Sequence, residues 1–394
     1  MKYCVLIMDG AAGLPLPEHG GRTSLELADT PNLDSMAGDG VVGLVRTVPE
    51  GMEPSSACAC MSVLGYDPGQ YYRGRAVIEA RSMGIPVGRG EVVFRCNLVA
   101  VRDGRMWSYG SGHISTGEAE QLVDALNRSL GSEDVHFYPG VSYRHICKLK
   151  GRRDTLRAVC TPPHDIPDQP IDVHLPRGRG SRYLRELMTA SQEVLREHPV
   201  NAARAARGEI PATTIWLFWG SGTALAMPAF RLHHGLSAAM TSAVDLLNGL
   251  ARMAQIDVLS IPGVTDSLDN DCTAQAEGAL GALDDHDLVV VHIEAPDEAA
   301  HVGSVKDKVE AIQRIDREVV SRLLAWNGGP LRMLILPDHP TPVTLRTHTA
   351  EPVPFILWGK GFDGNGATAF TEAEAGSTGL SINPGYNIMS MLIH

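Results

Sequence analysis

Short, continuous apolar runs recur along the chain, and each predicts a β-strand that is buried on both faces. The runs lie at 3–8, 213–219, 257–262, 287–293 and 331–337. A strand with one solvated face would alternate apolar and polar residues, so continuous runs indicate a mostly parallel sheet covered by helices. Helical patterns lie among these runs, at 242–255, 274–283 and 309–326. The alternation of strand and helix predicts a doubly wound α/β fold.

The segment 76–182 has a different pattern and predicts a smaller inserted α/β domain. It combines strand-like runs with a helical stretch at 117–131. It ends in a stretch rich in Pro, Gly and Arg at 166–182, which is typical of a linker. A helix at 184–198 then leads back to the first domain. We therefore expect a main domain built from residues 1–75 and 183–394, with residues 76–182 inserted into it.

Polar residues follow three of the predicted strands directly. Asp9 follows the first run, Asp297 follows the run at 287–293, and Asp338 and His339 follow the last run. In open α/β sheets, ligands gather at the carboxyl ends of the strands. The sequence therefore predicts one polar site at one edge of the sheet.

The spacing of carboxylates and imidazoles at these strand ends suits divalent metal ions. Asp297 and His301 are four residues apart and share a face if the segment is helical. His348 returns nine residues after His339, across a loop that contains prolines. Carboxylate oxygen and imidazole nitrogen together suit Mn, Zn or a similar ion. Each motif alone is also consistent with a solvated helix face, a cap or a turn, and only their combination favours a metal site.

Two serines, Ser55 and Ser56, precede an apolar stretch that resembles the start of a helix. A serine in this place is most often a helix cap. The alternative is a nucleophile, activated by the helix dipole and more strongly by direct contact with a cation. The segment alone leaves both interpretations open. The sequence contains no phosphate-binding loop of the G-x-x-x-x-G-K-[ST] type and no G-x-S-x-G elbow.

Composition excludes several classes of partner. The formal net charge of -12 argues against nucleic acid, which needs a dense surface of Lys and Arg. No apolar stretch reaches the roughly 18 residues of a membrane helix, and the N-terminal run is too short for an export signal. The 7 cysteines are odd in number and scattered. We therefore expect no membrane partner, reduced thiols and a cytoplasmic location.

Several segments together resemble the cofactor-independent phosphoglycerate mutases of the archaeal type, within the alkaline phosphatase superfamily. They are MDG (8–10), SVLGYDP (62–68), HIEAPDEAAH (292–301), and LPDHPTPV with RTHT (336–349). Shorter similar stretches extend the resemblance over nearly the whole chain. The resemblance implies an alkaline-phosphatase-like fold and two divalent ions, Mn, Zn or Mg, with no organic cofactor.

The same resemblance implies a role for each residue of the site. It assigns one metal ion to Asp297, His301 and His348, and the other to Asp9, Asp338, His339 and Ser56. Ser56 is the implied nucleophile, which takes a phosphoryl group from the substrate and returns it to the other hydroxyl of the retained glycerate. This reaction converts 3-phosphoglycerate to 2-phosphoglycerate through phosphoserine, so the implied enzyme is a phosphotransferase of the isomerase class.

The inserted domain is expected to bind the rest of a small phosphorylated or phosphonylated acid. Arginine is the preferred donor to such anions because it binds them with two hydrogen bonds. The candidate substrate contacts are His113, Arg73, Arg75, Arg95, Arg144, His164 and Asp165. Each is also consistent with a structural salt bridge or a surface charge. Lys308, which precedes the helix at 309–326, is interpreted as a solvated charge.

The sequence departs from the mutase pattern around the substrate. Ala57 stands where an acidic residue is expected, and Cys60 stands where an asparagine is expected. SYGSGHI (108–114) replaces an arginine-rich stretch. These departures keep three alternatives open. One is transfer to another small hydroxy acid, as in homoserine kinases or phosphonate metabolism. The others are a metal-dependent phosphohydrolase and a binding protein without activity.

Overall fold

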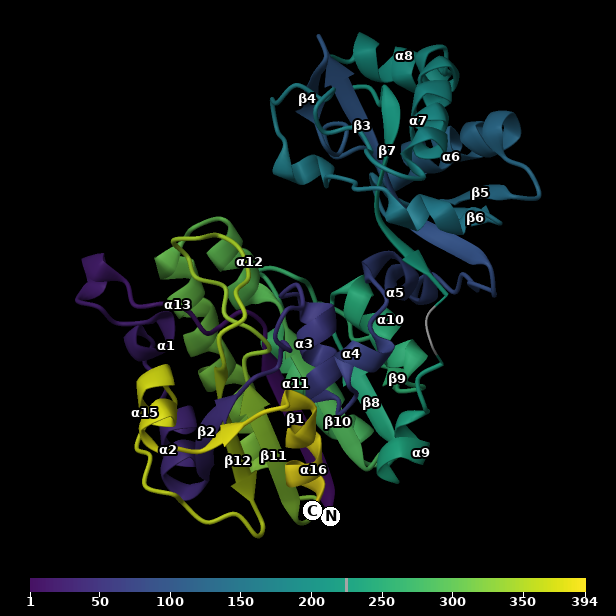
Figure 1. Ribbon diagram of the computed structural model, residues 1–394. Coiled ribbons are helices and arrows are strands. Elements are labelled where there is room, and N and C mark those ends of the chain that lie inside the picture. Colours follow the sequence, from purple (N-terminus) through teal and green to yellow (C-terminus); the bar gives the residue numbers. More distant parts are fainter. Residues whose placement is uncertain (224–225) are drawn as a thin grey trace. The chain divides into compact units, whose positions relative to one another are not determined.

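The chain forms two compact units in the computed structural model, which describes residues 1–223 and 226–394 (Figure 1). The first unit comprises Met1–Tyr72 and Ala226–His394, and the second comprises Arg73–Leu225. Each unit has its own cluster of buried apolar side chains. The second unit is thus an insertion in the first.

The first unit is built on an eight-stranded sheet in the order β13-β2-β12-β11-β1-β10-β8-β9. Five of its seven strand pairings are parallel, so the prediction of a mostly parallel α/β fold is confirmed. The strands are β1 (Lys2–Met8), β2 (Val41–Val45), β8 (Ala238–Thr241), β9 (Asp257–Val258), β10 (Leu288–Ile293), β11 (Leu331–Leu336), β12 (Val353–Gly359) and β13 (Ser381–Ile382).

Helices lie on both faces of this sheet, which explains why its central strands are continuously apolar. On β1, the alternate residues Cys4, Leu6 and Met8 pack into a core shared with α2, α11, α13, η4 and α15. The helices α3, α10 and α16 pack together on the other side of the sheet (Figure 1). The helices of the unit are α1 (Ser24–Leu27), α2 (Pro31–Asp39), α3 (Ser56–Val63), α4 (Pro68–Tyr71), α9 (Phe230–His234), α10 (Asp245–Met253), α11 (Cys272–Ala282), α12 (Ala295–His301), α13 (Val305–Arg314), η4 (Ile315–Val320), α14 (Ser321–Ala325), α15 (Glu372–Ser377) and α16 (Ile388–Ile393), with short turns η1 (Pro17–His19) and η5 (Gly385–Asn387).

The second unit is a five-stranded antiparallel sheet with helices against it. The order is β4-β3-β6-β5, and β7 also pairs with β3. Its strands are β3 (Glu91–Arg102), β4 (Arg105–Ser108), β5 (Val135–Tyr138), β6 (Arg144–Lys150) and β7 (Thr214–Gly222). Its helices are α5 (Arg75–Ser82), α6 (Thr116–Leu130), α7 (Ser181–Arg196) and α8 (Pro199–Ala206), with short turns η2 (Arg153–Arg157) and η3 (Pro163–Asp165).

Three expectations about the elements differ from the structure. The run at 213–219 is not a strand of the parallel sheet but lies in β7, which is antiparallel to β3 in the second unit. The expected end of the insertion at residue 182 comes too early, because α7 packs on β7 and the second unit continues to Leu225. The run at 257–262 contributes only the two residues of β9. No helix in the described ranges has the length and apolar character to cross a lipid bilayer.

Candidate active site

The carboxyl ends of three neighbouring strands carry the polar residues singled out in the sequence. β1 lies between β10 and β11, with Met8 level with Ile293 and Ile7 level with Leu336. The three strands run parallel, so the segments that follow them leave the sheet at the same edge. The strand order therefore makes immediate neighbours of the loops that contain Asp9, Asp297 and Asp338.

A close approach between these loops depends on the glycine that follows Asp9. Gly10 has a φ of 59°, in the left-handed region that favours glycine. A Cβ atom at this position would lie 2.7 Å from Thr341 Oγ1, much closer than van der Waals contact. The Gly10 amide donates to Asp338 Oδ1 at 3.1 Å. This hydrogen bond ties the end of β1 to the end of β11.

The first group of potential ligands comes from α12 and the loop after β11. His301 Nε2 lies 3.0 Å from Asp297 Oδ2, and His348 Nε2 lies 3.6 Å from Asp297 Oδ1. The two Nε2 atoms lie 3.0 Å apart. The Nδ1 atoms contact backbone carbonyls instead, Arg346 O at 3.0 Å and Pro54 O at 3.3 Å. Three potential metal ligands therefore converge on one point.

The protonation of these two rings follows from their carbonyl contacts. A carbonyl oxygen only accepts, so each Nδ1 must donate and each neutral ring keeps a lone pair on Nε2. Two lone pairs and the carboxylate of Asp297 then face one another, an arrangement that a divalent cation satisfies. Without a cation, the hydrogen bond to Asp297 raises the pKa of His301 to about 9. The residues fit a metal ion.

The second group of potential ligands surrounds the end of β1 and is fully buried. Asp9, Asp338 and His339 each have an exposure of 0%. His339 Nε2 lies 3.3 Å from Asp338 Oδ2 and 3.6 Å from Asp9 Oδ1. Burial lowers the pKa of His339 to about 4, so the ring is neutral. Burial, followed by repulsion from Asp338, raises the pKa of Asp9 well above its usual value. A cation at this point would offset the repulsion between the carboxylates.

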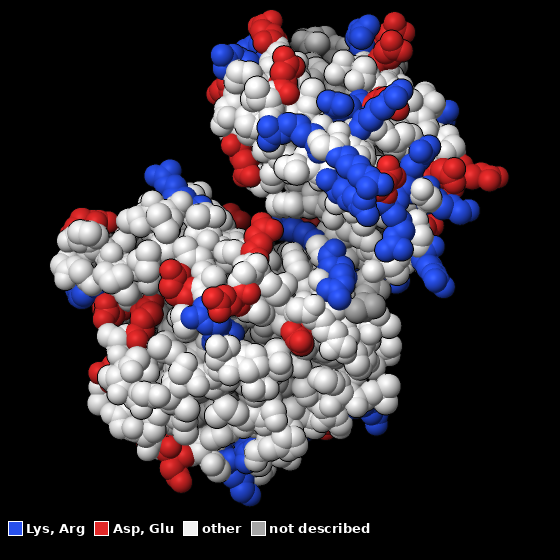
Figure 2. Space-filling model, viewed as in Figure 1, with Lys and Arg blue, Asp and Glu red and all other residues white. Residues whose placement is uncertain are grey.

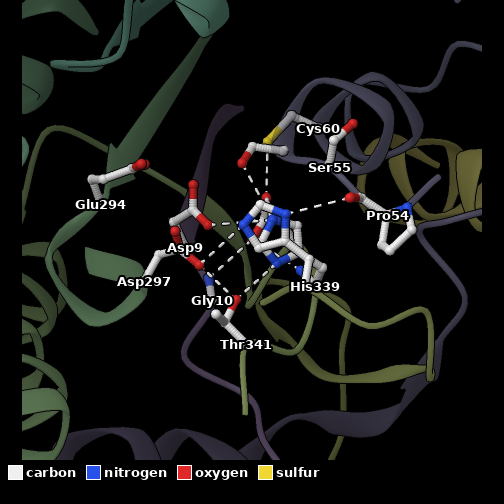
Figure 3. A network of polar contacts seen from close by, with 12 residues as sticks. Asp9, Gly10, Pro54, Ser55, Cys60, Glu294, Asp297, His339 and Thr341 are labelled. Carbon is white, nitrogen blue, oxygen red and sulfur yellow. Dashed lines mark hydrogen bonds and ion pairs between the residues drawn. The ribbon is translucent and has the colours of Figure 1, made fainter. Parts of the chain in front are cut away.

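Thr341 joins the two groups through its hydroxyl (Figure 3). Its Oγ1 donates to Asp297 Oδ1 at 2.5 Å and lies 3.2 Å from His339 Nδ1. Because the hydroxyl proton is given to Asp297, the oxygen is free to accept from Nδ1–H of His339. The Nε2 lone pair of His339 then points toward the carboxylates. Thr341 thus orients one ligand in each group.

The two serines at the start of α3 have different surroundings. Ser55 is the N-cap, and its hydroxyl accepts from the Cys58 amide. Ser56 is the first helical residue, and its Oγ lies 3.2 Å from His339 Nε2. Of the two hydroxyls, the one on Ser56 therefore contacts the second ligand group, while the one on Ser55 caps the helix.

Cys60 also faces the second ligand group. Its Sγ donates to Asp338 Oδ2 at 3.7 Å, and burial together with nearby carboxylates raises the pKa of its thiol well above the ordinary value. A neutral thiol therefore contacts Asp338 where the mutase pattern leads one to expect an amide. Ala57 is buried and offers no polar group.

Two of the arginines expected to contact substrate bind a buried carboxylate instead. Arg95 donates to both oxygens of Glu79, at 2.5 and 2.6 Å, and Arg75 donates to the same side chain at 3.1 Å. Burial alone would raise the pKa of Glu79, but Arg95 and Arg75 lower it below its usual value. Arg75 also lies over the ring of Trp219, 4.4 Å from its centroid. Glu79 therefore offsets much of the positive charge expected here.

The other five candidates for substrate contact lie in the second unit as well. Figure 2 shows Lys and Arg side chains gathered on the face of this unit that is in view. His113 lies against the rings of Tyr109 and Tyr143, Arg144 lies over the ring of Tyr143, and His164 lies against the ring of Trp219. Asp165 makes a weak ion pair with His164. Arg73 lines a pocket of about 480 Å³ together with Arg89 and Arg153. All seven candidates thus belong to one unit, and all seven potential metal-site residues belong to the other.

Several residues near the site could not be predicted from the sequence. Thr341, His292 and Glu294 lie within the motifs that predicted it, but nothing in the sequence marks their contacts. Lys308 was expected to be solvated, and that expectation is wrong. Its side chain is fully buried, and Nζ donates to Ala12 O and Thr341 O at 2.9 Å each. The ammonium group holds the loops after β1 and β11 together.

Comparisons with known proteins agree on one family. A family model described as 2,3-bisphosphoglycerate-independent phosphoglycerate mutase matches residues 37–201. Proteins with that name from Methanothrix thermoacetophila and Methanosarcina acetivorans are 47% and 44% identical to the chain, each over 100% of both sequences. The PH0037 protein of Pyrococcus horikoshii has a similar structure, with a TM-score of 0.82, 27% identity, and coverage of 100% of this chain and 96% of that one. The cofactor-independent phosphoglycerate mutase of Thermoplasma acidophilum gives a TM-score of 0.66, 25% identity, and coverage of 100% and 99%.

Proposed function

Because the chain belongs to the family of 2,3-bisphosphoglycerate-independent phosphoglycerate mutases, we propose that it interconverts 3-phosphoglycerate and 2-phosphoglycerate. The proposal is supported most directly by the position of Ser56, whose hydroxyl lies 3.2 Å from His339 at the second ligand group. A nucleophile in that place could reach a phosphoryl group bound between the two groups. We infer a soluble cytoplasmic enzyme that acts on a small phosphorylated acid.

We propose that the two ligand groups bind two divalent ions, with Mn the first choice and Zn or Mg the alternatives. One ion would be held by Asp297, His301 and His348, and the other by Asp9, Asp338, His339 and Ser56. Such ions lower the pKa of a bound hydroxyl and stabilise negative charge that develops on phosphoryl oxygens. Mixed carboxylate and imidazole donors suit these ions.

The proposed chemistry is carried by Ser56. After losing its proton, Oγ attacks phosphorus, the bond from phosphorus to the glycerate oxygen breaks, and that oxygen takes up a proton. The other hydroxyl of the same glycerate then loses its proton and attacks the phosphoserine, the bond from phosphorus to Oγ breaks, and Oγ takes a proton back, which restores Ser56 and completes the isomerisation. Ser56 Oγ and His339 Nε2 lie 3.2 Å apart, so both could contact the same ion, which would hold Ser56 in place for this attack.

We propose that the second unit binds a small acid, with Arg73, Arg144, His113, His164 and Asp165 as the candidate contacts. One observation favours a second candidate function at the same site. Glu79 already binds Arg75 and Arg95, which removes two of the arginines expected to grip the glycerate carboxylate. The second candidate is therefore phosphoryl transfer on another small phosphorylated or phosphonylated hydroxy acid.

The test is an enolase-coupled assay of the protein reconstituted with Mn²⁺, with Ser56→Ala and Ser55→Ala as a matched pair. The wild-type protein should turn over 3-phosphoglycerate with a kcat in the range of roughly 1–10³ s⁻¹. Ser56→Ala should lower kcat by about 10⁴-fold or more, whereas Ser55→Ala removes a helix cap worth about 1 kcal/mol and should keep most of the activity. Equal loss in both variants would contradict the role of Ser56.

Phosphorus NMR of the same samples separates the alternatives. Formation of 2-phosphoglycerate alone supports the mutase. Release of inorganic phosphate without the isomer would make the protein a hydrolase. Turnover of phosphohomoserine or a phosphonate acid, with no turnover of phosphoglycerate, would support the second candidate and overturn the first.

A further inference from the structure

A pocket in the second unit is lined by three arginines and by no carboxylate. The arginines are Arg73, Arg89 and Arg153, and the volume of the pocket is about 480 Å³. The other lining residues are Leu156, Thr223 and three glycines. Arg73 begins the second unit and Thr223 lies near its end, so the segments that enter and leave this unit both contribute to the pocket. All the charged side chains that line this hollow are therefore positive.

The positive charge of the pocket is not balanced by acidic side chains of the chain. Arg89 and Arg153 are exposed, and no carboxylate among the described residues forms an ion pair with either of them. Arg95 in the same unit is paired, in contrast, because it contacts Glu79 at 2.5 Å. Guanidinium groups that converge without a counter-charge repel one another. The pocket therefore favours an anionic ligand.

Further arginines lie on the surface that adjoins the pocket. Arg152 and Arg157 stand beside and at the end of η2, which contains Arg153 and a single carboxylate, Asp154. The backbone of Val159 pairs with that of Arg177, which brings the segment before α7 alongside the segment that follows η2.

That second segment carries four exposed arginines, and in the described part of the chain only Arg182 forms an ion pair, with Glu186 at 2.7 Å. The four are Arg177, Arg179, Arg182 and Arg185. Figure 2 shows Lys and Arg side chains gathered on the face of the second unit that is in view. The pocket is thus part of a larger basic surface.

The amount of positive charge favours a ligand with several phosphate groups. A single phosphate ester carries a charge of about -1.5 to -2, whereas the pocket has three guanidinium groups, with Arg152 and Arg157 next to it. Guanidinium groups bind phosphate oxygens through two parallel hydrogen bonds. The formal net charge of -12 disfavours a long polynucleotide, which would extend beyond the basic surface. A short chain of phosphate groups satisfies both conditions.

We propose that the pocket formed by Arg73, Arg89 and Arg153 binds a small anion with two or more linked phosphate groups. The source is an inorganic polyphosphate or the phosphate chain of a nucleotide. One phosphate group occupies the pocket, and the next groups contact Arg152 and Arg157. This binding site goes beyond the proposed function and does not depend on it. Arg73 is also a candidate substrate contact, so the test uses Arg89 and Arg153 instead.

The test is equilibrium dialysis of radiolabelled inorganic triphosphate against the full chain, with excess Mg²⁺ present so that the probe does not remove bound ions. Wild-type protein should bind the probe. The double variant Arg89→Gln with Arg153→Gln should bind it about 100-fold more weakly, because each lost hydrogen bond between charged groups costs about 10-fold. The matched control Arg128→Gln removes the same charge from an exposed position on α6 and should keep the wild-type affinity.

Two results of the dialysis would overturn the proposal. One is that wild-type protein fails to bind triphosphate, including the case in which it binds polyglutamate instead, which would assign the basic surface to an acidic protein. The other is equal binding in wild type and the double variant, which would place the probe elsewhere, for example at the metal-ligand groups of the first unit. Phosphoglycerate turnover is measured separately, and its absence would overturn the proposed function alone.

Two further measurements identify the source of the ligand and its position. ATP in place of triphosphate separates the two sources: equal affinity means that the phosphate chain alone is recognised, and an affinity more than about 10-fold higher, or about 1.4 kcal/mol, means that the nucleotide is the ligand. A crystal structure of the wild-type chain with triphosphate needs no variant. Density between Arg89 and Arg153 supports the proposal, and density only at other places would overturn it.

Discussion

Removing the hydroxyl of Thr341 should disturb both groups of proposed metal ligands at once. Thr341→Val keeps the shape of this fully buried side chain and leaves its backbone contacts to Ala12 and Lys308 in place. It deletes the hydrogen bond to Asp297 and the acceptor for His339 Nδ1. His339 is then free to change tautomer, which turns a proton instead of a lone pair toward the proposed cation.

The size of the effect follows from the two lost contacts. A hydrogen bond to a charged group contributes about 1.5–3 kcal/mol. Loss of a residue that orients a metal ligand typically costs about 10- to 100-fold in metal affinity or activity. We therefore expect Thr341→Val to bind Mn²⁺ at the catalytic groups about 10- to 100-fold more weakly, with a comparable fall in kcat/KM at limiting metal.

Calorimetric titration of metal-free protein with Mn²⁺, followed by the enolase-coupled assay at saturating Mn²⁺, measures both quantities. Thr341→Ser is the matched control, because it keeps the hydroxyl and loses only a methyl group. Its Mn²⁺ affinity should stay within a few-fold of wild type. Wild-type affinity in Thr341→Val, or equal loss in Thr341→Ser, would refute the idea that the hydroxyl orients the ligands.

Three further substitutions test the contacts that support the site and the second unit. Gly10→Ala places a Cβ against Thr341 and forces alanine into a left-handed conformation, which costs about 1–2 kcal/mol for the backbone alone. The urea midpoint of unfolding should therefore fall, and an unchanged midpoint would contradict the steric argument. Lys308→Met leaves two buried carbonyls unpaired, at about 1–3 kcal/mol each, and should likewise lower the free energy of unfolding of the first unit; wild-type stability would show that Lys308 does not hold the loops together. Glu79→Gln breaks a buried ion pair with Arg95 and should cost the second unit about 3–5 kcal/mol near pH 7. Because the pKa of Glu79 is lowered in the folded state, its contribution to the free energy of unfolding is present above the unfolded pKa of about 4.3. That contribution is lost as the pH falls through the lower folded pKa. Tryptophan fluorescence during urea unfolding should therefore show the difference in stability between wild type and variant closing in acid, and a constant difference would contradict this.

The sequence predicted the fold class because apolar runs without alternation are compatible with few environments. A run such as residues 3–8 has to be covered on both faces, and the parallel sheet with helices on both sides provides that cover. The same reasoning gave the wrong sheet for 213–219. That run is equally apolar, but its partner is β3, and the antiparallel sheet of the second unit is covered there by α7. The apolar character of a run predicts that the run is buried, whereas the strand with which it pairs depends on contacts between distant segments of the chain.

The strand-end residues could be predicted for a similar reason, and the residues that hold them could not. Whatever the order of parallel strands, their carboxyl ends share one edge, so Asp9, Asp297 and Asp338 were expected together. Thr341 donates a hydrogen bond to Asp297, and Lys308 donates to the backbone of Ala12 and Thr341, so both side chains bind partners that lie far away in the sequence. A threonine or a lysine is common at the surface, and only the fold shows which one has been buried against a ligand.

The substrate end of the site shows how far residue type can mislead when pairing is unknown. An arginine predicts an anion, but the sequence does not say whether that anion is a ligand or a carboxylate of the same chain. Glu79 lies four residues after Arg75 on α5, and it also binds Arg95 from β3. A buried Glu with two guanidinium partners presents far less net charge to a substrate than two free arginines would. Arg75 and Arg95 should therefore contribute little to substrate specificity in this protein, and exchanging them should leave the metal count unaltered.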